Sequence, residues 1–358
     1  MYCAIATYNV RKAGAFAAVL LLFSLPAGAT PCQDTTVTDF GDVSQAPAEL
    51  VRRPEIHLTD AGDHCLQSSV RQRKLWDVRT GRERTTIGGD GVILIGAHDV
   101  RLDLRGHAIS NDRALGYTLV KHYQHVPGRK HVHWFKRTHI RNGSLVSPGS
   151  KGIALRLIAA GMYGPEGFGT VAEVPQGAQP ADIFLDTSHL IDGLKIEAGR
   201  RAILIDGKNN VIRNNRITVD AATAIVAQGP GIIIENNVIE VRNHLEALSE
   251  FDRSIDSKTP FAIRLIQADG AIVRNNEIRL LDREGRGGLP AAIDLVSTRG
   301  ALVEGNVFGG MEAAVHADDQ SSYREERNAM EPCRGKETRF LPPDETGQLK
   351  RLPAAVCR

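Results

Sequence analysis

The chain has 358 residues, of which 42% are hydrophobic, enough for a sizeable buried core. Its formal charge is only +2 at pH 7, with 44 basic and 42 acidic residues. This balance argues against a nucleic-acid-binding protein, because neutralising phosphates requires a net basic face.

The first 29 residues have the features of a secretion signal. Arg11 and Lys12 precede an apolar run, residues 13–25, that is shorter than a membrane span requires. An Ala-Gly-Ala cleavage site follows, so we expect a mature chain that begins at Thr30 and is secreted or periplasmic, with no membrane span. A retained membrane anchor is the alternative. Removal of the signal takes away two basic residues and no acidic residue. The mature chain would then carry 42 basic and 42 acidic residues, a formal charge of zero.

The cysteines indicate disulfide bonds near both ends of the mature chain. Four cysteines remain after signal removal, an even number in an oxidising compartment. We predict the two local pairs Cys32–Cys65 and Cys333–Cys357. Metal binding by these cysteines is disfavoured, since no Cys-x-x-Cys spacing occurs.

A seven-residue motif recurs in the second half of the chain. The four copies are Val211–Ile217, Ile233–Ile239, Ile272–Ile278 and Leu302–Phe308. The first three carry Asn-Asn at their centre, and Asn tolerates the left-handed backbone of a tight turn and can hydrogen-bond its copy in the next repeat. A fixed period of this kind indicates stacked structural repeats, whereas unrelated surface turns would not recur in register.

Three apolar columns accompany the motif when its copies are aligned. The first is Ile109, Leu145, Ile196, Ile217, Ile239, Ile278 and Phe308. The second is Ile140, Ile191, Ile212, Ile234, Val273 and Val303. The third is Ile153, Ile203, Ile225, Ile263, Ile293 and Val315. Three short β-runs per repeat, each with inward aliphatic residues, predict long parallel sheets in which every strand pairs with its copy in the next repeat.

This pattern resembles the pectate-lyase-like superfamily, and residues 55–62 and 100–109 resemble the opening repeats of its carbohydrate-binding and sugar-hydrolase-type members. The resemblance covers about residues 55–318 and implies an all-β, single-stranded right-handed parallel β-helix with N- and C-terminal caps. We expect four parts. They are the signal (1–29), an N-terminal segment and cap (30–90), the β-helix (91–319) and a C-terminal cap or tail (320–358).

The resemblance also implies that the outer face of the sheet after the Asn turn is the substrate groove. The outward column expected on this sheet is Ala154, Leu204, Val226, Arg264, Asp294 and His316. Asp318, two residues beyond His316, would face the same way. Long insertions at residues 158–187, 243–259 and 282–289 would flank this face, and long loops on a rigid scaffold often carry function. Arg264, Asp294, His316 and Asp318 are therefore the predicted catalytic residues.

A surface charge ladder is the alternative to a catalytic site. The column before the Asn turn alternates in sign. Its members are Asp192, Arg213, Glu235, Arg274 and Glu304. Such cross-strand pairs stabilise a sheet by less than about 1 kcal/mol each and need no ligand. Arg264, Asp294 and His316 could form a shorter ladder of the same kind.

The expected function is binding of, or action on, an acidic polysaccharide as a lyase, epimerase or hydrolase. A proton-abstracting enzyme needs a base and a cation for the uronate carboxylate, whereas a hydrolase needs two carboxyl groups, for which Asp294 and Asp318 are the candidates. The catalytic signatures of the superfamily's epimerases, polygalacturonases and pectate lyases are absent, which favours a non-catalytic carbohydrate-binding or structural module as the alternative. No cofactor is expected, although the resemblance admits calcium through Asp318 and Asp319.

Five histidines form a second cluster in the first half of the chain. They are His122, His125, His131, His133 and His139. The spacing of His131 and His133 can hold a metal, but several Lys and Arg residues crowd this segment. A basic loop that contacts an anionic sugar is the interpretation that this composition favours.

Overall fold

The described part of the chain is all-β, as the sequence predicts. The structure is a computed structural model that describes residues 32–35, 56–72, 75–77, 82–84, 92–111, 118–122, 135–149, 152–158, 184–220, 223–242, 261–281 and 289–331. These residues belong to one compact unit, Cys32–Arg358, and contain strands but no helix. Over the same ranges no helix could therefore span a membrane. The signal residues 1–29 lie outside the described residues.

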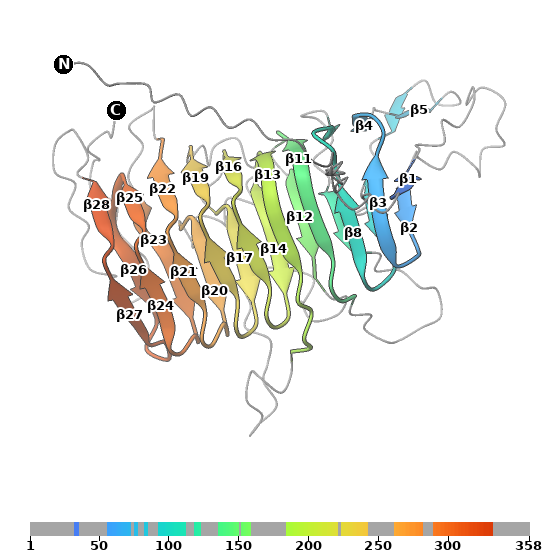
Figure 1. Cartoon of the computed structure of the whole chain (residues 1–358). Coiled ribbons are helices and arrows are strands. Elements are labelled where there is room, and N and C mark those ends of the chain that lie inside the picture. The colour runs from blue at the N-terminus through green and yellow to red at the C-terminus, as the bar shows by residue number, and fades with distance from the viewer. Residues whose placement is uncertain are drawn as a thin grey trace, which may run out of the picture. The chain divides into compact units, whose positions relative to one another are not determined.

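One sheet of nine parallel strands contains the outward column that carries the predicted site. Its strands, in spatial order, are β2 (Ile56–Leu58), β7 (Ile93–Ile95), β10 (Thr118–His122), β12 (Ile153–Leu157), β14 (Arg201–Asp206), β17 (Ile225–Gln228), β20 (Ile263–Ile266), β23 (Leu289–Val296) and β26 (Met311–Ala317). Spatial order and chain order coincide, so each strand pairs only with the copies before and after it (Figure 1).

The Asn turns and the remaining columns lie in a second sheet of 17 strands. Its strands are β1 (Gln33–Thr35), β3 (Gly62–Leu66), β4 (Val70–Gln72), β8 (Val100–Asp103), β9 (Ala108–Asn111), β11 (His139–Ser147), β13 (Leu190–Ala198), β15 (Val211–Arg213), β16 (Arg216–Val219), β18 (Ile233–Glu235), β19 (Val238–Val241), β21 (Ile272–Arg274), β22 (Glu277–Leu280), β24 (Ala301–Glu304), β25 (Val307–Gly309), β27 (Tyr323–Glu326) and β28 (Ala329–Glu331). A separate antiparallel pair joins β5 (Leu75–Asp77) to β6 (Arg82–Arg84).

Three strands recur as a unit, which we call a rung. The rung β17–β18–β19 lies between the rungs β14–β15–β16 and β20–β21–β22, and each strand pairs in parallel with its equivalent on both sides. The prediction of three β-runs per repeat is thus confirmed, and the arrangement is compatible with an all-β solenoid. Rungs also occur before residue 91 and after residue 319, the predicted limits of the β-helix. Strands β2, β3 and β4 pair with β7, β8 and β9, and strands β27 and β28 pair with β24 and β25.

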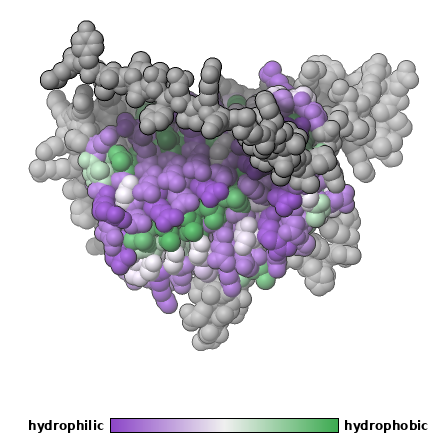
Figure 2. Space-filling model, viewed as in Figure 1, coloured by the Kyte–Doolittle hydropathy of each residue, from purple (hydrophilic) through white to green (hydrophobic). Residues whose placement is uncertain are grey.

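The core consists of the inward apolar columns. Ile212, Ile234 and Val273 are Cα partners in successive rungs and are completely buried. The column through Ile217 and Phe308 is buried in the same way. Each fully buried aliphatic side chain stabilises the fold by roughly 1.5–3 kcal/mol, so every rung adds several kcal/mol of hydrophobic burial. The outer surface is mostly hydrophilic on the face drawn in Figure 2, with a narrow hydrophobic band across it.

The third apolar column was wrong at its first member. Leu155, not Ile153, is the partner of Ile203, and Ile153 pairs with Arg201 instead. The segment Ile153–Leu157 carries aliphatic residues at alternate positions, so its pattern fits two registers equally well. Backbone pairing with β14 decides between them.

The two asparagines of each turn have different structural roles. The first adopts a left-handed backbone, with φ of 56° at Asn214, 55° at Asn236 and 53° at Asn275. The second is buried and forms a ladder in which Asn215 Nδ2 donates to Asn237 Oδ1 at 3.0 Å. The ladder continues through Asn276, Asn306 and Asn328. These bonds satisfy amides that a buried tight turn would otherwise leave without partners.

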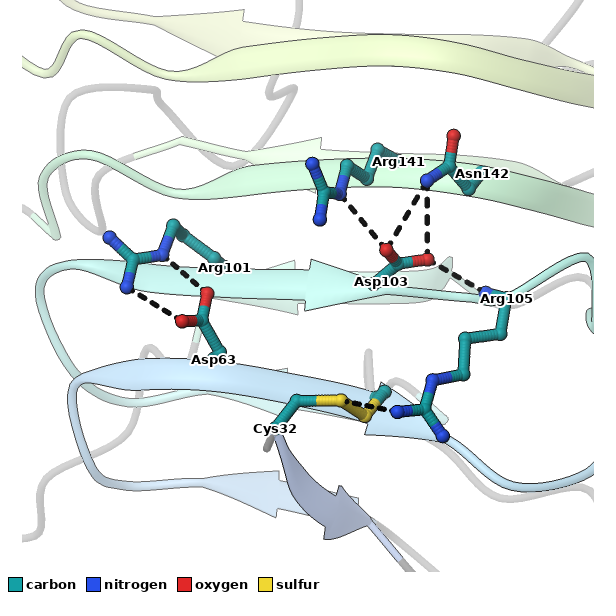
Figure 3. The surroundings of a disulfide bond; sticks show 8 residues. Cys32, Asp63, Arg101, Asp103, Arg105, Arg141 and Asn142 are labelled. Carbon is teal, nitrogen blue, oxygen red and sulfur yellow. Dashed lines mark hydrogen bonds and ion pairs between the residues drawn. A yellow bond between two sulfur atoms is a disulfide. The ribbon is translucent and has the colours of Figure 1, made fainter. Parts of the chain in front are cut away.

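The Cys32–Cys65 disulfide is confirmed and attaches the strand β1 to the first rung. The two Cα atoms are 5.9 Å apart. Next to the bond, Gln33–Thr35 pairs in parallel with His64–Leu66 of β3 (Figure 3). The predicted pair Cys333–Cys357 lies outside the described residues.

Candidate functional site

Three of the predicted site residues lie on neighbouring strands of the nine-stranded sheet. Arg264 on β20 is the Cα partner of Asp294 on β23, which is the Cα partner of His316 on β26. Adjacent strands are about 4.8 Å apart, so alternation along the strands and register between them place all three side chains in one row. Each of the three directly follows an inward residue, namely Ile263, Ile293 or Val315, so its side chain points outward.

Asp294 connects the other two residues, with one carboxylate oxygen for each. Its Oδ1 lies 2.9 Å from Nδ1 of His316, and its Oδ2 lies 3.4 Å from Nε of Arg264. The Asp294 side chain is only 4% exposed. A buried carboxylate needs partners of opposite charge or hydrogen-bond donors, and here both partners are supplied by neighbouring strands.

Arg264 is desolvated but poorly satisfied. Its side chain is 15% exposed, and its buried Nε makes no hydrogen bond, because the 3.4 Å contact with Asp294 lacks hydrogen-bond geometry. Burial lowers the pKa of Arg264, while Asp294 and Asp318 act in the opposite direction. The guanidinium remains charged over the physiological range. A charged donor group left unsatisfied in this way favours a ligand with a carboxylate or a similar anion.

His316 has one nitrogen fixed and the other available. Nδ1 is bound to Asp294, whereas the side chain is 49% exposed and Nε2 has no partner within the described residues. The pKa of His316 is raised, mainly by the hydrogen bond with Asp294 and also by the negative charges of Asp294 and Asp318. Partial burial and the positive charge of Arg264 lower it, but their effect is smaller. This arrangement suits proton transfer at Nε2, because the carboxylate orients the ring and stabilises its protonated form.

Phe261 is a site residue that the sequence did not reveal. Its ring stacks on His316 with centroids 5.3 Å apart and planes inclined by 21°, and Phe261 itself is only 4% exposed. It therefore restricts the orientation of the imidazole from one side. The only signal in the sequence was an aromatic residue immediately before the repeated Ala262-Ile263 pair, and its contact with His316 depends on a residue 55 positions later.

Asp318 lies near the row but has a different role. Its Oδ2 accepts a hydrogen bond from Ser297 N at 2.9 Å, and its Oδ1 accepts from Gln320 N at 3.2 Å and Ser321 Oγ at 2.6 Å. Both oxygens thus stabilise turns. The described residues contain no group of three or more His, Cys, Asp or Glu side chains suited to a metal ion. Both Asp318 oxygens already accept hydrogen bonds, and Asp318 belongs to no such group among the described residues, so a calcium site is not seen there.

The outward column differs from the expected one at its N-terminal end. Because Leu155 pairs with Ile203, the outward neighbour of Leu204 is Arg156 and not Ala154. Arg156 is the Cα partner of Lys121 on β10. Ala154 is fully buried in the core. Arg156 and Lys121 therefore lie in the same row as Arg264, separated from it by the buried Leu204 and Val226.

The predicted charge ladder is confirmed on the other sheet, and it differs from the site. Arg213 reaches Asp192 at 2.9 Å and Arg274 reaches Glu235 at 2.6 Å. Both arginines donate through Nε and Nη2 and are about 40% exposed. Arg264 is much less exposed and makes no such hydrogen bond, so the site is not simply another stretch of the ladder.

Of the five clustered histidines the structure describes His122 and His139, and His122 is a core residue. His122 is buried, and its ring lies 4.9 Å from that of His189, centroid to centroid. Burial lowers the pKa of His122 far below its usual value and that of His189 to about 3. Both imidazoles are therefore neutral core groups. His125, His131 and His133 lie outside the described residues.

Comparison of the chain with protein-family models, with curated proteins and with solved structures gives no match.

Proposed function

We propose that the protein is an exported right-handed parallel β-helix that acts on an acidic polysaccharide at Arg264, Asp294 and His316. The handedness comes from the family resemblance together with the strong preference of parallel β-crossovers for the right hand. Export follows from the signal-like residues 1–29. Amino-terminal sequencing of the secreted or periplasmic protein tests the export proposal, and a mature chain that starts at Thr30 is the expected result.

The observation that carries the catalytic proposal is the use of both Asp294 oxygens. One oxygen orients a half-exposed imidazole, and the other lies beside a desolvated guanidinium whose Nε makes no hydrogen bond. The guanidinium of Arg264 would bind a uronate carboxylate, and Nε2 of His316 would exchange a proton with the same sugar. Asp294 is the positioning residue, because it holds the imidazole in one tautomer.

The chemistry that fits these groups is proton abstraction beside a carboxylate. Neutral His316 would take the proton from the carbon next to the carboxylate, and the electron pair of that C–H bond would move toward the carboxylate, whose negative charge Arg264 stabilises. Expulsion of the glycosidic oxygen from the neighbouring carbon would then form a C=C bond, as in a lyase, with the leaving oxygen taking a proton from protonated His316 or from water. Delivery of a proton from water to the opposite face of the carbanion would instead give an epimer. A two-carboxylate hydrolase is less well supported, because both oxygens of Asp318 are engaged in turns.

A panel of polyuronates and neutral glycans tests this function. Products would be assayed as unsaturated ends by ultraviolet absorbance, as reducing ends, and as changed uronate stereochemistry by NMR. We expect activity on a polyuronate alone, and a loss of at least about 100-fold with His316→Ala, in line with the usual contribution of a general base. Arg274→Gln, which removes an arginine of the ladder, is the matched control and should retain activity.

A non-catalytic binding module is the second candidate, and the raised pKa of His316 favours it. A protonated His316 beside Arg264 presents two cationic groups to a polyanion. Binding that is specific for polyuronates and needs both residues, with no product from any glycan, would support this candidate and would contradict the enzymatic one. Neither binding nor product across the panel would contradict both.

A further inference from the structure

The disulfide of the first rung presents its two cysteines unequally. Cys65 lies on β3 and is completely buried, whereas Cys32 directly precedes β1 and is partly exposed. Exchange between a thiol and a disulfide proceeds by attack of a thiolate on one of the two sulfur atoms, and access helps to decide which one is attacked. The fold therefore directs a thiolate that arrives from solvent to Sγ of Cys32.

A guanidinium lies beside that sulfur atom. Nη2 of Arg105 is 2.9 Å from Sγ of Cys32. In Figure 3 the side chain of Arg105 extends from the turn after β8 back to the disulfide. A cation in this position attracts an anionic thiolate and stabilises the negative charge that the sulfur atoms carry during exchange.

The main chain of Arg105 is held in a specific turn by Asp103. Arg105 has a left-handed backbone, with φ of 49°, and its N–H donates to Oδ1 of Asp103 at 2.9 Å. The same carboxylate accepts from Nε of Arg141 at 3.0 Å and from Nδ2 of Asn142 at 3.2 Å. A left-handed backbone is unfavourable for a residue with a side chain, and these hydrogen bonds stabilise it. Asp103 thus fixes the turn through the main chain, while the guanidinium of Arg105 lies at the disulfide.

Arg101, on the same side of the disulfide, has a different environment. Its side chain is exposed, and its Nη2 donates to Oδ2 of Asp63 at 2.8 Å, so its charge is balanced by a carboxylate (Figure 3). Arg105 forms no ion pair with any described residue. Of these two arginines, Arg105 is therefore the one whose charge acts on the sulfur atoms.

We propose that the Cys32–Cys65 disulfide is an exchange site for a small thiol, which becomes attached to Cys32 with the assistance of Arg105. The incoming thiolate forms a bond with Sγ of Cys32 as the bond between Cys32 and Cys65 breaks. Sγ of Cys65 leaves with the electron pair of that bond and takes up a proton from water. The product is a mixed disulfide at Cys32 and a buried thiol at Cys65. One thiol is consumed and one is formed, so no further oxidant or reductant is needed. The inference is independent of the polysaccharide site.

Reduced glutathione is the probe, because it is a small thiol whose adduct mass spectrometry can locate. The full chain is incubated with it, exchange is stopped with acid, and thiols are labelled with N-ethylmaleimide after denaturation. We expect glutathione on Cys32 and the label on Cys65. The initial rate should fall about two- to fivefold in Arg105→Gln, as expected for an exposed cation. Arg101→Gln, which removes an equally exposed but paired guanidinium, is the matched control and should change the rate by less than about 1.5-fold.

A second measurement applies if Cys65 displaces the glutathione before the adduct can be detected. The folded protein is reduced with dithiothreitol, which supplies two electrons and two protons as it closes to its own cyclic disulfide. After removal of the reductant, alkylation of Cys32 by iodoacetamide is followed against pH by peptide mapping. We expect the rate to rise at a lower pH in the wild type than in Arg105→Gln, because Arg105 stabilises the Cys32 thiolate.

Three results would overturn the proposal. The first is glutathione attached to Cys65 in preference to Cys32. The second is a disulfide that neither glutathione nor dithiothreitol opens in the folded chain. The third is an exchange rate and an alkylation profile that Arg105→Gln leaves unchanged, or changes no more than Arg101→Gln does. Circular dichroism checks that each variant is folded. If Arg105→Gln does not fold, Arg105→Asn replaces it, because asparagine tolerates the left-handed backbone and also removes the charge.

Discussion

Asp294 and His316 form a hydrogen-bonded pair across adjacent parallel strands, with 2.9 Å between Oδ1 and Nδ1. The carboxylate is buried and the imidazole is half exposed. One partner is thus fixed by the protein while the other meets solvent or a ligand. Phe261 on one side and Arg264 beyond the carboxylate complete the arrangement.

The pKa of His316 should depend on Asp294. The hydrogen bond and the charge of Asp294 both raise this pKa above its usual 6.5. In Asp294→Asn we expect the NMR titration midpoint of the His316 ring to move to lower pH. A general base acts in its neutral form, so activity of the wild type should rise as pH increases through the raised pKa. The variant's lower activity should rise at a lower pH. An unchanged midpoint in Asp294→Asn would contradict this, and Glu235→Gln on the other sheet serves as the control.

Arg264 should determine affinity for an anionic glycan. Its guanidinium is desolvated and its Nε makes no hydrogen bond, so a bound carboxylate would make charge-assisted bonds worth about 1.5–3 kcal/mol. We expect Arg264→Gln to weaken binding of a polyuronate about 10- to 100-fold, as measured by calorimetry. Arg274→Gln removes the same charge from an exposed ladder position and should change affinity less than about twofold. Equal effects of the two substitutions would show that only net charge matters.

The Asn ladder should be a major source of stability. Asn237 accepts from Asn215 Nδ2 at 3.0 Å and donates to Ile212 O and Asn276 Oδ1 at 3.0 and 2.9 Å. Asn237→Ala leaves several buried groups without partners, so we expect a loss of about 3 kcal/mol or more in urea unfolding. The adjacent Asn236→Gly is the control. With φ at 55°, this position suits glycine, so the change should stay within about 1 kcal/mol. Similar losses in both variants would refute the ladder's importance.

Buried His189 should make the fold sensitive to acid. Its pKa is lowered to about 3 in the folded chain, against 6.5 for an ordinary histidine. The unfolded chain therefore takes up a proton first. Stability from this group is fully present above about pH 6.5 and is lost as pH falls toward about 3, by about 1.4 kcal/mol per pH unit. Between about pH 6 and about pH 5, the wild type should lose about 1 kcal/mol more than His189→Gln in urea unfolding. Parallel losses in the two proteins would contradict this.

The sequence predicted the repeat better than the register. Copies of Ile-x-Asn-Asn-x-Ile fixed the inward positions from Ile191 onward, because a buried aliphatic and a left-handed Asn each have one place in a rung. The rung at Arg327-Asn328 was missed, although this pair lies 22 residues after Gly305-Asn306, because its apolar positions carry Arg324 and Glu325. The assignment of Ala154 to the outward column failed because alternate aliphatic residues in Ile153–Leu157 fit two registers.

The sequence by itself determined the all-β class, the parallel rungs and the row of Arg264, Asp294 and His316, because side-chain alternation and a fixed period are local properties. Only the tertiary structure decided which members of the row are buried, that Asp318 is engaged by Ser297 and Ser321, and that Phe261 stacks on His316. Those properties depend on turns and on groups many residues apart, so no window of sequence contains them. The difference between a charge ladder and a candidate site lies in that burial.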